Sequence, residues 1–367
     1  MKILQVITDT DRRGAQVFAT DLQAGLERRG QAVETVALAP GGSPVRLDLE
    51  VLGPSRLARS TLTELRRRIR AADVVVAHGS TTLPACALAG VGTATPFVYR
   101  QISDSLYWAP TRLRRARVRA GLARAARVVA LSAEARSVLC DRFGVASDRI
   151  DVIPNGVPRG DHRAATPQQK RSARAHFGLE AERPTVAVLS ALVPEKGVDL
   201  AIAAVGRLPR AQLLVAGDGP ERGALEQQAQ QQAPGRVRFA GSLPDPALAY
   251  DAADLILLAS RGGDSMPAVL IEAGFRRLPA VATDVGAIAE VIEQGVTGLV
   301  VPEAAVLPIS EAIGSLLDDP ETAQAMGAEA ETRCGARFEI DVVAEAWVAT
   351  LQSTVQNRQG RRRPRSR

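Results

Sequence analysis

Short apolar runs alternate with amphipathic stretches along most of the chain, and this alternation predicts the class of fold. The run KILQVIT (2–8) is mostly apolar, as is typical of a parallel strand buried on both faces. Alternating strands and helices predict an α/β fold with a parallel sheet. Further strands of this first series are expected at 32–38, 73–78, 96–100 and 127–132.

The alternation stops near VIPNGV (152–157), where a short strand meets a Pro/Asn/Gly turn, and it restarts at residue 184. A second series of strands is expected at 184–192, 211–219, 236–242, 254–260, 279–284 and 297–302. Two such series predict two doubly wound Rossmann-like domains, with ligands bound beyond the carboxyl ends of the strands, in the cleft between the domains. The expected boundaries are 1–157 for the first domain, 158–183 for a polar linker, 184–340 for the second domain, 341–354 for a C-terminal helix that is free to return to the first domain, and 355–367 for a disordered basic tail.

Composition narrows the class of protein further. The chain is 46% hydrophobic and 23% charged, which suits a soluble protein with real cores. No apolar stretch reaches the ~20 residues of a membrane span, and the first apolar run is too short for a signal peptide. The three cysteines lie far apart without a CxxC pair, so we expect a cytoplasmic protein with reduced thiols. The three histidines are equally scattered, and their spacing gives no metal site.

Charge is distributed unevenly. Residues 1–155 hold 23 Lys and Arg against 14 Asp and Glu, whereas residues 156–354 hold 17 against 26. The run RLRRARVRAGLARAARVV (112–129) is the strongest basic stretch. It has two interpretations: a solvated helix face, or a surface through which the N-terminal half meets an acidic acceptor or makes peripheral contact with an anionic membrane. Aromatic residues are only 3% of the chain and do not interleave with the basic runs, so a nucleic acid is not an expected partner.

Two loops after expected strands of the second domain have the residues to hold a phosphate. In ALVPEKGVDL (191–200), Gly197 permits a turn into a helix and places Lys196 beside the helix N-terminus, a position suited to an anion. A solvated turn lysine is the alternative. In VAGDGPERG (215–223), the third glycine falls one place too late for a dinucleotide fingerprint. The turn at Gly217 favours instead a close approach of backbone to a nucleotide.

A third loop, GGDSMPAVLIEAGF (262–275), contains an unusual glutamate. Ser265 is suited to cap a helix and Pro267 to begin it. Glu272 then lies among valine, leucine and isoleucine, and burying a charge without a partner costs several kcal/mol. Glu272 therefore needs either a protein partner or a ligand.

The three loops, in this order, resemble those of the retaining nucleotide-sugar glycosyltransferases of family 4, which have the GT-B fold. RRGAQVFATDLQAGLERRG resembles the family's first loop and helix, and VIPNGV its interdomain signature. The series PEKG, GDGPE, FAGSL, DSMPAVLIEAG and GLVVP extends the resemblance over nearly the whole chain. It implies transfer of a sugar from a nucleotide-diphosphate sugar to an unidentified acceptor, with retention of anomeric configuration and without a required metal or cofactor.

The resemblance also implies roles for residues at matching positions. Asp264 and Glu272 occupy the two ends of the family's E-x7-E motif. Glu272 would accept hydrogen bonds from the donor ribose, so its partner would be a ligand. Asp264 would contact the donor sugar, helped by the backbone amides of Ser265 and Met266, and Lys196 would neutralise the departing diphosphate.

The remaining donor-binding residues are expected to act mainly through backbone. Gly14, in the first loop of the first domain, would leave room for the phosphates. Gly197 and Gly217 would bring the chain close to the donor, and Leu243 matches the place where main chain commonly meets the nucleobase.

The chain departs from the family pattern at two positions. Asp264 is one methylene shorter than the usual glutamate, and Ala191 replaces an arginine that many members place before the lysine. Arg100, after the strand PFVYR, is our candidate replacement for that missing cation and a fourth expected catalytic residue. His78, at the end of another expected strand, is either a cleft residue or a structural one.

Other interpretations of the sequence compete with this one. A catalytically silent nucleotide-sugar binder fits the departures at Ala191 and Asp264. A sugar-nucleotide epimerase or a phosphorylase fits the same architecture, and a NAD oxidoreductase fits it less well. Asp9 and Asp11 could form the metal-binding Asp-x-Asp motif of the other glycosyltransferase fold, or simply a polar loop.

Overall fold

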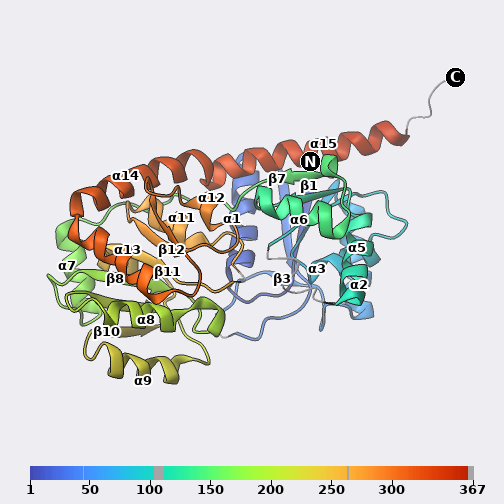
Figure 1. Ribbon diagram of the computed structural model, residues 1–367. Helices are drawn as coiled ribbons and strands as arrows, with labels where there is room; N and C mark the ends of the chain where they lie inside the picture. Colours follow the sequence, from blue (N-terminus) through green and yellow to red (C-terminus); the bar gives the residue numbers. More distant parts are fainter. Residues whose placement is uncertain (44, 103–110, 263, 363–367) are drawn as a thin grey trace. The chain divides into compact units, whose positions relative to one another are not determined.

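The chain folds into two compact units (Figure 1). The computed structural model describes residues 1–43, 45–102, 111–262 and 264–362. The first unit comprises Met1–Pro158 and Arg337–Arg367, and the second comprises Arg159–Ala336. Each unit is an α/β structure built on a single parallel sheet, as the alternating pattern predicts.

The first unit is built on a parallel sheet of seven strands in its described part, in the order β3-β2-β1-β4-β5-β6-β7. Strand β1 is central, because Ile3 pairs with Val33 on one side and with Val74 on the other. The strands are β1 (Lys2–Ile7), β2 (Ala32–Ala37), β3 (Glu50–Val51), β4 (Val74–His78), β5 (Phe97–Arg100), β6 (Arg127–Ala130) and β7 (Ile150–Val152).

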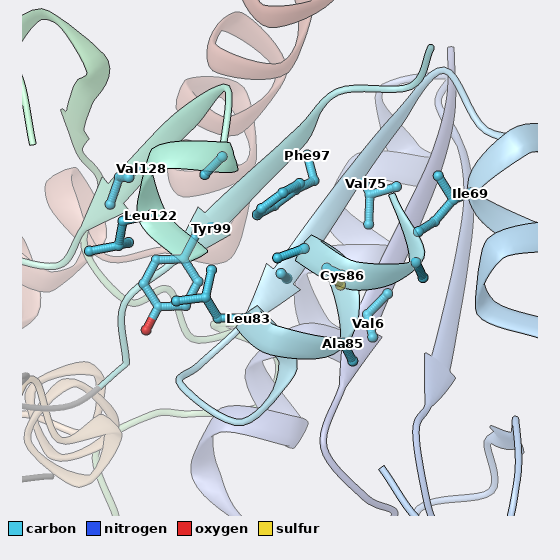
Figure 2. Close-up of a cluster of buried hydrophobic side chains, with 14 of the residues drawn as sticks. Val6, Ile69, Val75, Leu83, Ala85, Cys86, Phe97, Tyr99, Leu122 and Val128 are labelled. Carbon is cyan, nitrogen blue, oxygen red and sulfur yellow. The ribbon is translucent and has the colours of Figure 1, made fainter. Parts of the chain in front are cut away.

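Helices cover both faces of this sheet. Its strands are therefore buried on both sides and consist mainly of apolar residues. Alternate residues of one strand point to opposite faces, so Val74 and Val76 of β4 contribute to one core, and Val75 to the other. Figure 2 shows Val75 packed near Cys86 of α3 and Val6 of β1. The helices are α1 (Gly14–Arg28), α2 (Arg59–Ala71), α3 (Thr82–Ala89), α5 (Arg112–Arg124), α6 (Ala133–Phe143), the short η1 (Ser147–Arg149) and α15 (Ile340–Arg362).

The C-terminal helix α15 packs on α1 within the first unit. Trp347 and Leu351 are fully buried there with Phe18. The two segments where the chain crosses between the units are joined inside the first unit, because the Val157 amide donates to the Phe338 carbonyl at 2.9 Å and the Ile340 amide to the Val157 carbonyl at 3.0 Å.

The expectation of a disordered tail from residue 355 is wrong for 355–362, which continue α15. Composition alone missed two contacts that favour the helix. Val355 packs against the core that contains Trp347, and Arg358 donates to the Thr93 carbonyl at 3.2 Å. Residues 363–367 lie outside the described residues.

The second unit is built on a parallel sheet of six described strands in the order β10-β9-β8-β11-β12-β13. The strands are β8 (Thr185–Leu189), β9 (Gln212–Ala216), β10 (Val237–Gly241), β11 (Leu255–Leu258), β12 (Ala280–Thr283) and β13 (Gly298–Val301). The helices are α7 (Pro167–His176), η2 (Pro194–Lys196), α8 (Val198–Gly206), α9 (Arg222–Gln232), α10 (Ala247–Ala252), α11 (Ala268–Phe275), α12 (Ile288–Val291), α13 (Val306–Asp318) and α14 (Pro320–Arg337).

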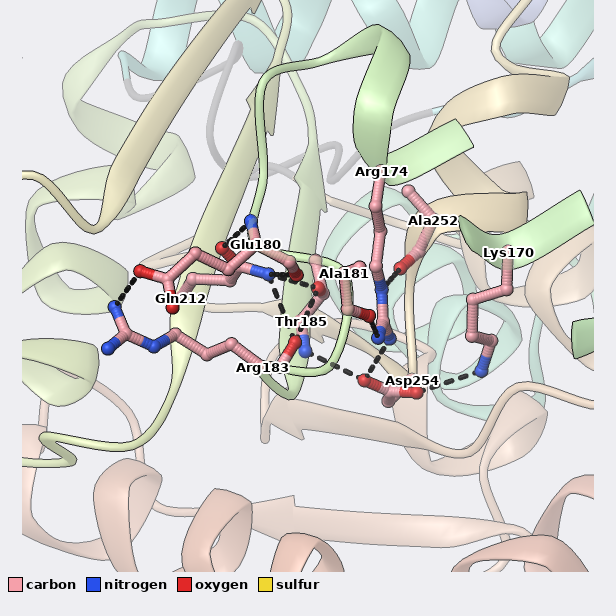
Figure 3. Close-up of polar contacts among 9 residues, drawn as sticks. All are labelled: Lys170, Arg174, Glu180, Ala181, Arg183, Thr185, Gln212, Ala252 and Asp254. Atoms are coloured by element: carbon pink, nitrogen blue, oxygen red, sulfur yellow. Dashed lines mark hydrogen bonds and ion pairs between the residues drawn. The ribbon is translucent and has the colours of Figure 1, made fainter. Parts of the chain in front are cut away.

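The segment 158–183 differs from the linker that its polar composition suggests, because residues from Arg159 onward belong to the second unit. Its helix α7 packs on α10 and is fixed by Asp254 (Figure 3). This carboxylate accepts from Arg174 at 2.5 Å, from Lys170 at 2.8 Å and from the Thr185 amide at 2.7 Å. Arg174 is only 5% exposed and also donates to the carbonyls of Ala181 and Ala252.

No helix in the described part of the chain combines the length and the apolar character that a bilayer crossing requires.

Replacing Asp254 with alanine is expected to destabilise the second unit by about 2–4 kcal/mol, because the buried Arg174 guanidinium loses its charged partner. Urea unfolding followed by circular dichroism measures this change. The control is Lys170→Ala, which removes the more exposed partner of the same carboxylate and should change the stability by less than about 1 kcal/mol. Equal effects of the two variants would contradict the assignment of Arg174 as the stabilised group.

Candidate functional site

The loops that follow β8, β9 and β11 lie at one edge of the second unit's sheet. These three strands are neighbours in the order β9-β8-β11, and all are parallel. Their carboxyl ends therefore meet at the same edge, which is where ligands bind in sheets of this type. All three loops that the sequence marks for phosphate or sugar binding begin there.

Two glycines allow backbone to pass against backbone at this edge. Gly197 has φ +61°, and a β-carbon placed there would lie 1.9 Å from the carbonyl oxygen of Ala259. Gly217 has φ +146°, and its β-carbon would lie 1.8 Å from the carbonyl oxygen of Ser190. Both positions therefore require glycine for the path of the chain itself.

Lys196 and Asp264 form an ion pair between the first loop and the third. The ammonium contacts one carboxylate oxygen, and the hydroxyl of Ser260 donates to the other. The side chains are 26% and 10% exposed, respectively, so the pair lies at the edge of solvent with its acid more deeply buried. Asp264 is closely packed, because a β-carbon at Gly286 would lie 1.9 Å from its carbonyl oxygen.

Glu272 lies on α11, is half-buried, and has a protein partner that the sequence does not reveal. The hydroxyl of Tyr250 donates to its Oε2 at 2.5 Å. Burial, together with the adjacent carboxylate, holds the pKa of Tyr250 well above its ordinary value, so this hydroxyl remains a donor at neutral pH. The neighbours Leu270 and Ile271 are buried, as the apolar sequence around Glu272 predicts.

Arg100 and His78 lie in the first unit, at the ends of β5 and β4, and both are buried. Arg100 is 1% exposed; its guanidinium donates to the Asn155 side-chain oxygen and lies 3.7 Å from the centroid of the Phe18 ring. Burial lowers the pKa of Arg100 to about 9. Arg100 is thus held by partners of its own unit, and its expected role as a replacement cation stays a prediction.

His78 is held in one tautomer by its neighbours. The amide nitrogen of Gln5 donates to the Ala19 carbonyl at 2.9 Å, which leaves the Gln5 oxygen to accept from Nε2 of His78 at 2.9 Å. Nδ1 of His78 therefore faces Arg100 as an acceptor, at 3.4 Å. Burial and the Arg100 charge lower the pKa of His78 well below its ordinary value. The arrangement favours the structural interpretation of this histidine.

The other predicted donor-binding residues are found in both units. Gly14 begins α1, and a β-carbon there would meet nothing within 4 Å, so the backbone borders open space. Leu243 is half-buried in the loop after β10. Met266 is buried, and the carbonyl of the half-buried Ser265 accepts from the Ala287 amide at 2.8 Å.

The prediction that Ser265 caps the helix is wrong. Helix α11 begins at Ala268, and Pro267 is the capping residue without a side-chain hydrogen bond. Ser265 instead lies two residues further out, in backbone that pairs with the loop after β12.

Asp9 and Asp11 are bound by neighbouring protein groups. Asp9 accepts from Arg13 and from Gln16, and Asp11 accepts from the Ser43 amide at 2.8 Å. Across the described ranges, no group of three or more His, Cys, Asp or Glu side chains is placed to hold a metal ion.

Sequence reasoning missed Tyr250, Ser260 and Arg261, which contact the predicted site residues or their loop. Ser260 and Arg261 directly follow the buried strand β11, so their position at the carboxyl end of a strand was an available signal. Tyr250 had no such signal, because it lies on α10, 22 residues before the glutamate that it contacts.

Comparison with known proteins places both halves of the chain in glycosyltransferase families. Residues 12–160 match the family model described as Glycosyltransferase Family 4, and residues 169–333 match the model described as Glycosyl transferases group 1. The chain therefore belongs to the GT-B glycosyltransferases of the family 4 type, as the order of its loops indicates.

Curated relatives are similar over part of their length. The chain is 32% identical over 224 residues to the D-inositol 3-phosphate glycosyltransferase of Nocardia farcinica, a match covering 57% of this chain and 49% of the relative. It is 29% identical over 230 residues to the alpha-D-kanosaminyltransferase of Streptomyces kanamyceticus, covering 60% and 59%. The matched segment thus spans about half the length of the first relative.

A solved structure supports the same fold over nearly the full chain. HepE of Anabaena, crystallised with UDP, superposes with a TM-score of 0.85 at 22% identity, covering 96% of this chain and 100% of that one. Because the identity is low, this likeness establishes the GT-B fold and nothing finer.

Replacing Gly197 with alanine is expected to destabilise the second unit by at least ~2 kcal/mol, because the left-handed backbone alone costs about 1–2 kcal/mol and the β-carbon would meet Ala259. Thermal and urea unfolding measure the change. Gly223→Ala is the matched control, since no atom lies within 4 Å of a β-carbon there, and it should leave stability unchanged or raise it by up to about 0.5–1 kcal/mol. A Gly197→Ala protein as stable as the control would contradict the backbone packing.

Proposed function

We propose that the protein is a glycosyltransferase that moves a sugar from a nucleotide-diphosphate sugar to an acceptor, with retention of anomeric configuration and without a required metal. The observation that carries the proposal is the Lys196–Asp264 ion pair at the carboxyl edge of the second unit's sheet, in which Asp264 lies on the loop that leads into α11, the helix of Glu272. Membership of the family and the nucleotide-bound structure of HepE, solved with UDP and with UDP-glucose, support a nucleotide sugar as donor.

The charges of the site fit the parts of such a donor. A diphosphate develops negative charge as it leaves, and a preorganised cation stabilises that charge. Lys196 is such a cation, because Asp264 holds its ammonium in place. Asp264 in turn offers acceptor oxygens to the hydroxyls of the donor sugar, and Ser265 and Met266 offer backbone amides beside it.

Glu272 is suited to bind the ribose. The hydrogen bond from Tyr250 to Oε2 fixes the orientation of the carboxylate, which accepts hydrogen bonds from the two ribose hydroxyls in this proposal. Gly217 and Leu243, on the neighbouring loops, contribute backbone close to the nucleotide.

Retention follows from a reaction on one face of the sugar. The bond from the anomeric carbon to the diphosphate oxygen breaks, and the acceptor oxygen forms its bond to the same face. The acceptor proton passes to an oxygen of the departing phosphate, so no protein base is needed. This route agrees with the site, where the carboxylates of Asp264 and Glu272 already have hydrogen-bond donors.

Lys196 supplies the positive charge that a divalent metal would supply in other glycosyltransferases. We therefore expect the rate of sugar transfer to be unchanged in EDTA and after addition of manganese. Loss of activity in EDTA that manganese restores would overturn the metal-free proposal.

Lys196→Ala and Glu272→Ala are each expected to lower the rate of sugar transfer at least ~100-fold, as the loss of a well-placed transition-state contact does. A thermal-shift screen of UDP, GDP and ADP sugars selects the donor, and mass spectrometry with cell extract as acceptor measures product. Lys2→Ala and Glu321→Ala are the controls, because Lys2 begins β1 of the first unit and Glu321 is exposed at the start of α14, and both variants should retain full activity. A near-normal rate in either site variant would remove that residue from the proposal.

A catalytically silent nucleotide-sugar binder is the second candidate, favoured by Ala191 and by the shorter Asp264. The same experiment separates the two functions. Calorimetric binding of the selected donor without product from any extract fraction supports the binder, whereas product supports the transferase. Conversion of the donor to its epimer without an acceptor would support an epimerase instead.

We also propose that the first unit makes peripheral contact with anionic membrane through α5. Arg112, Arg114 and Arg117 are exposed on this helix and have no carboxylate partner among the described residues, and Leu113 beside them is 64% exposed. Unpaired arginines near an anionic surface contribute about 1 kcal/mol each.

Replacing these three arginines with serine is expected to weaken binding to phosphatidylglycerol vesicles at least ~10-fold. Sedimentation with the vesicles measures this, and vesicles of phosphatidylcholine should bind neither protein. The control replaces three exposed arginines of the second unit, Arg171, Arg207 and Arg210, and should retain binding. Equal loss in both variants would show that net charge alone drives the contact and would overturn the assignment to α5.

A further inference from the structure

We propose that Arg261 is a positioning residue, which holds the Pro194–Lys196 turn against the end of β11 and thereby fixes the ammonium of Lys196. The sequence did not predict a role for Arg261, and the proposed function gives it none. The link to donor binding rests on the proposed function, whereas the link to Lys196 rests on geometry alone.

Arg261 contacts the turn through both its backbone and its side chain. Its amide donates to the Glu195 carbonyl at 2.8 Å, and its Nη1 donates to the Pro194 carbonyl at 2.9 Å. These two carbonyls belong to the two residues directly before Lys196. The guanidinium therefore holds the backbone from which the lysine side chain extends.

The remaining donors of Arg261 anchor it to α8. Nη1 and Nη2 bind the two oxygens of Asp199 at 2.7 and 2.6 Å, the bidentate geometry that orients both groups most strictly. These hydrogen bonds lower the pKa of Asp199, which keeps the carboxylate charged at neutral pH. Asp199 is itself held, because its carbonyl accepts from Gln228 at 2.9 Å.

The partial exposure of the Arg261–Asp199 ion pair indicates that its main effect is to position the turn rather than to stabilise the fold. The side chains of Arg261 and Asp199 are 34% and 40% exposed, and ion pairs at such positions contribute little to folding. The turn, by contrast, has a single glycine hinge at Gly197, directly after Lys196. Without its guanidinium, residue 261 would keep its backbone bond to Glu195, but the Pro194 carbonyl would lose the side-chain contact that ties the turn before Lys196 to Asp199.

The first experiment needs no donor. The chain has only three lysines, Lys2, Lys170 and Lys196, so reductive ¹³C-methylation gives a simple NMR spectrum in which Lys196→Arg identifies one signal. In Arg261→Ala we expect the Lys196 signal to shift or broaden while the Lys2 and Lys170 signals stay in place. An unchanged Lys196 signal would overturn the proposal.

The second experiment measures the effect on phosphate recognition. Calorimetry compares UDP, GDP and ADP with their monophosphates, and the preference for the diphosphate is expected to fall at least ~5-fold in Arg261→Ala. Asp199→Asn should give a similar loss, and the double variant no further loss, because the two residues act as one unit. Arg261→Lys should restore little, since an ammonium lacks the planar fork that binds both oxygens of Asp199 while it contacts the Pro194 carbonyl.

Arg210→Ala is the matched control, because Arg210 forms an exposed ion pair with Asp318 in the same unit and lies before β9, at the opposite edge of the sheet. It should change neither the Lys196 signal nor the diphosphate preference. If Arg261→Ala unfolds, Asp199→Asn tests the same prediction. A wild-type protein that binds no nucleoside diphosphate would contradict the proposed function and leave the NMR result to decide on Arg261. Wild-type preference retained in both variants would overturn the role of Arg261 in donor binding.

Discussion

The close approach of the turn before Gly197 to the end of β11 is the constraint on which the site depends. The carbonyl oxygen of Ala259 occupies the space that any β-carbon at residue 197 would need. Because the two segments touch at this point, the residues on either side of it are brought together. Lys196 precedes the contact on one segment, and Ser260 and Asp264 follow it on the other, so the ion pair is a direct consequence of the backbone path.

Two of the predicted site cations, Lys196 of the second unit and Arg100 of the first, have different surroundings. Lys196 has an anionic partner, Asp264, and lies near solvent, as the proposed contact with a phosphate requires. Among the described residues, Arg100 has neutral partners and an aromatic ring around it, and its Nε makes no hydrogen bond with any of them. A buried cation without a carboxylate is costly, and the cost is compatible with folding only because Asn155 and Phe18 enclose it.

The sequence was sufficient for the architecture and for the edge of the sheet at which the three marked loops meet, because both depend on local patterns. Strands such as Val74–His78 are buried on both faces and so appear as apolar runs, and Lys196 and Asp264 follow such strands. The sequence did not show which residues far apart in the chain contact each other. The apolar neighbours of Glu272 indicated that a partner was needed, yet nothing local pointed to Tyr250. Polar composition was equally misleading for 158–183, since the polar residues of α7 are the ones that bind Asp254.

The missing arginine at Ala191 leaves the site with fewer cations than the family pattern has, and the structure limits what can replace it. Arg261 is the nearest alternative along the chain to Asp264, but its guanidinium is committed to Asp199 and to the Pro194 carbonyl. Arg100 is committed to Asn155. Of Arg100, Arg261 and Lys196, Lys196 is the one that pairs with the predicted site residue Asp264, and we propose that it meets the diphosphate at this edge. A single lysine is placed well beside a leaving group only if its backbone is already ordered. Any backbone freedom of the turn would otherwise be lost on binding, at a cost in conformational entropy. The loss of one cation thus makes the rigidity of the turn before Gly197 more important than it would be in a site with two.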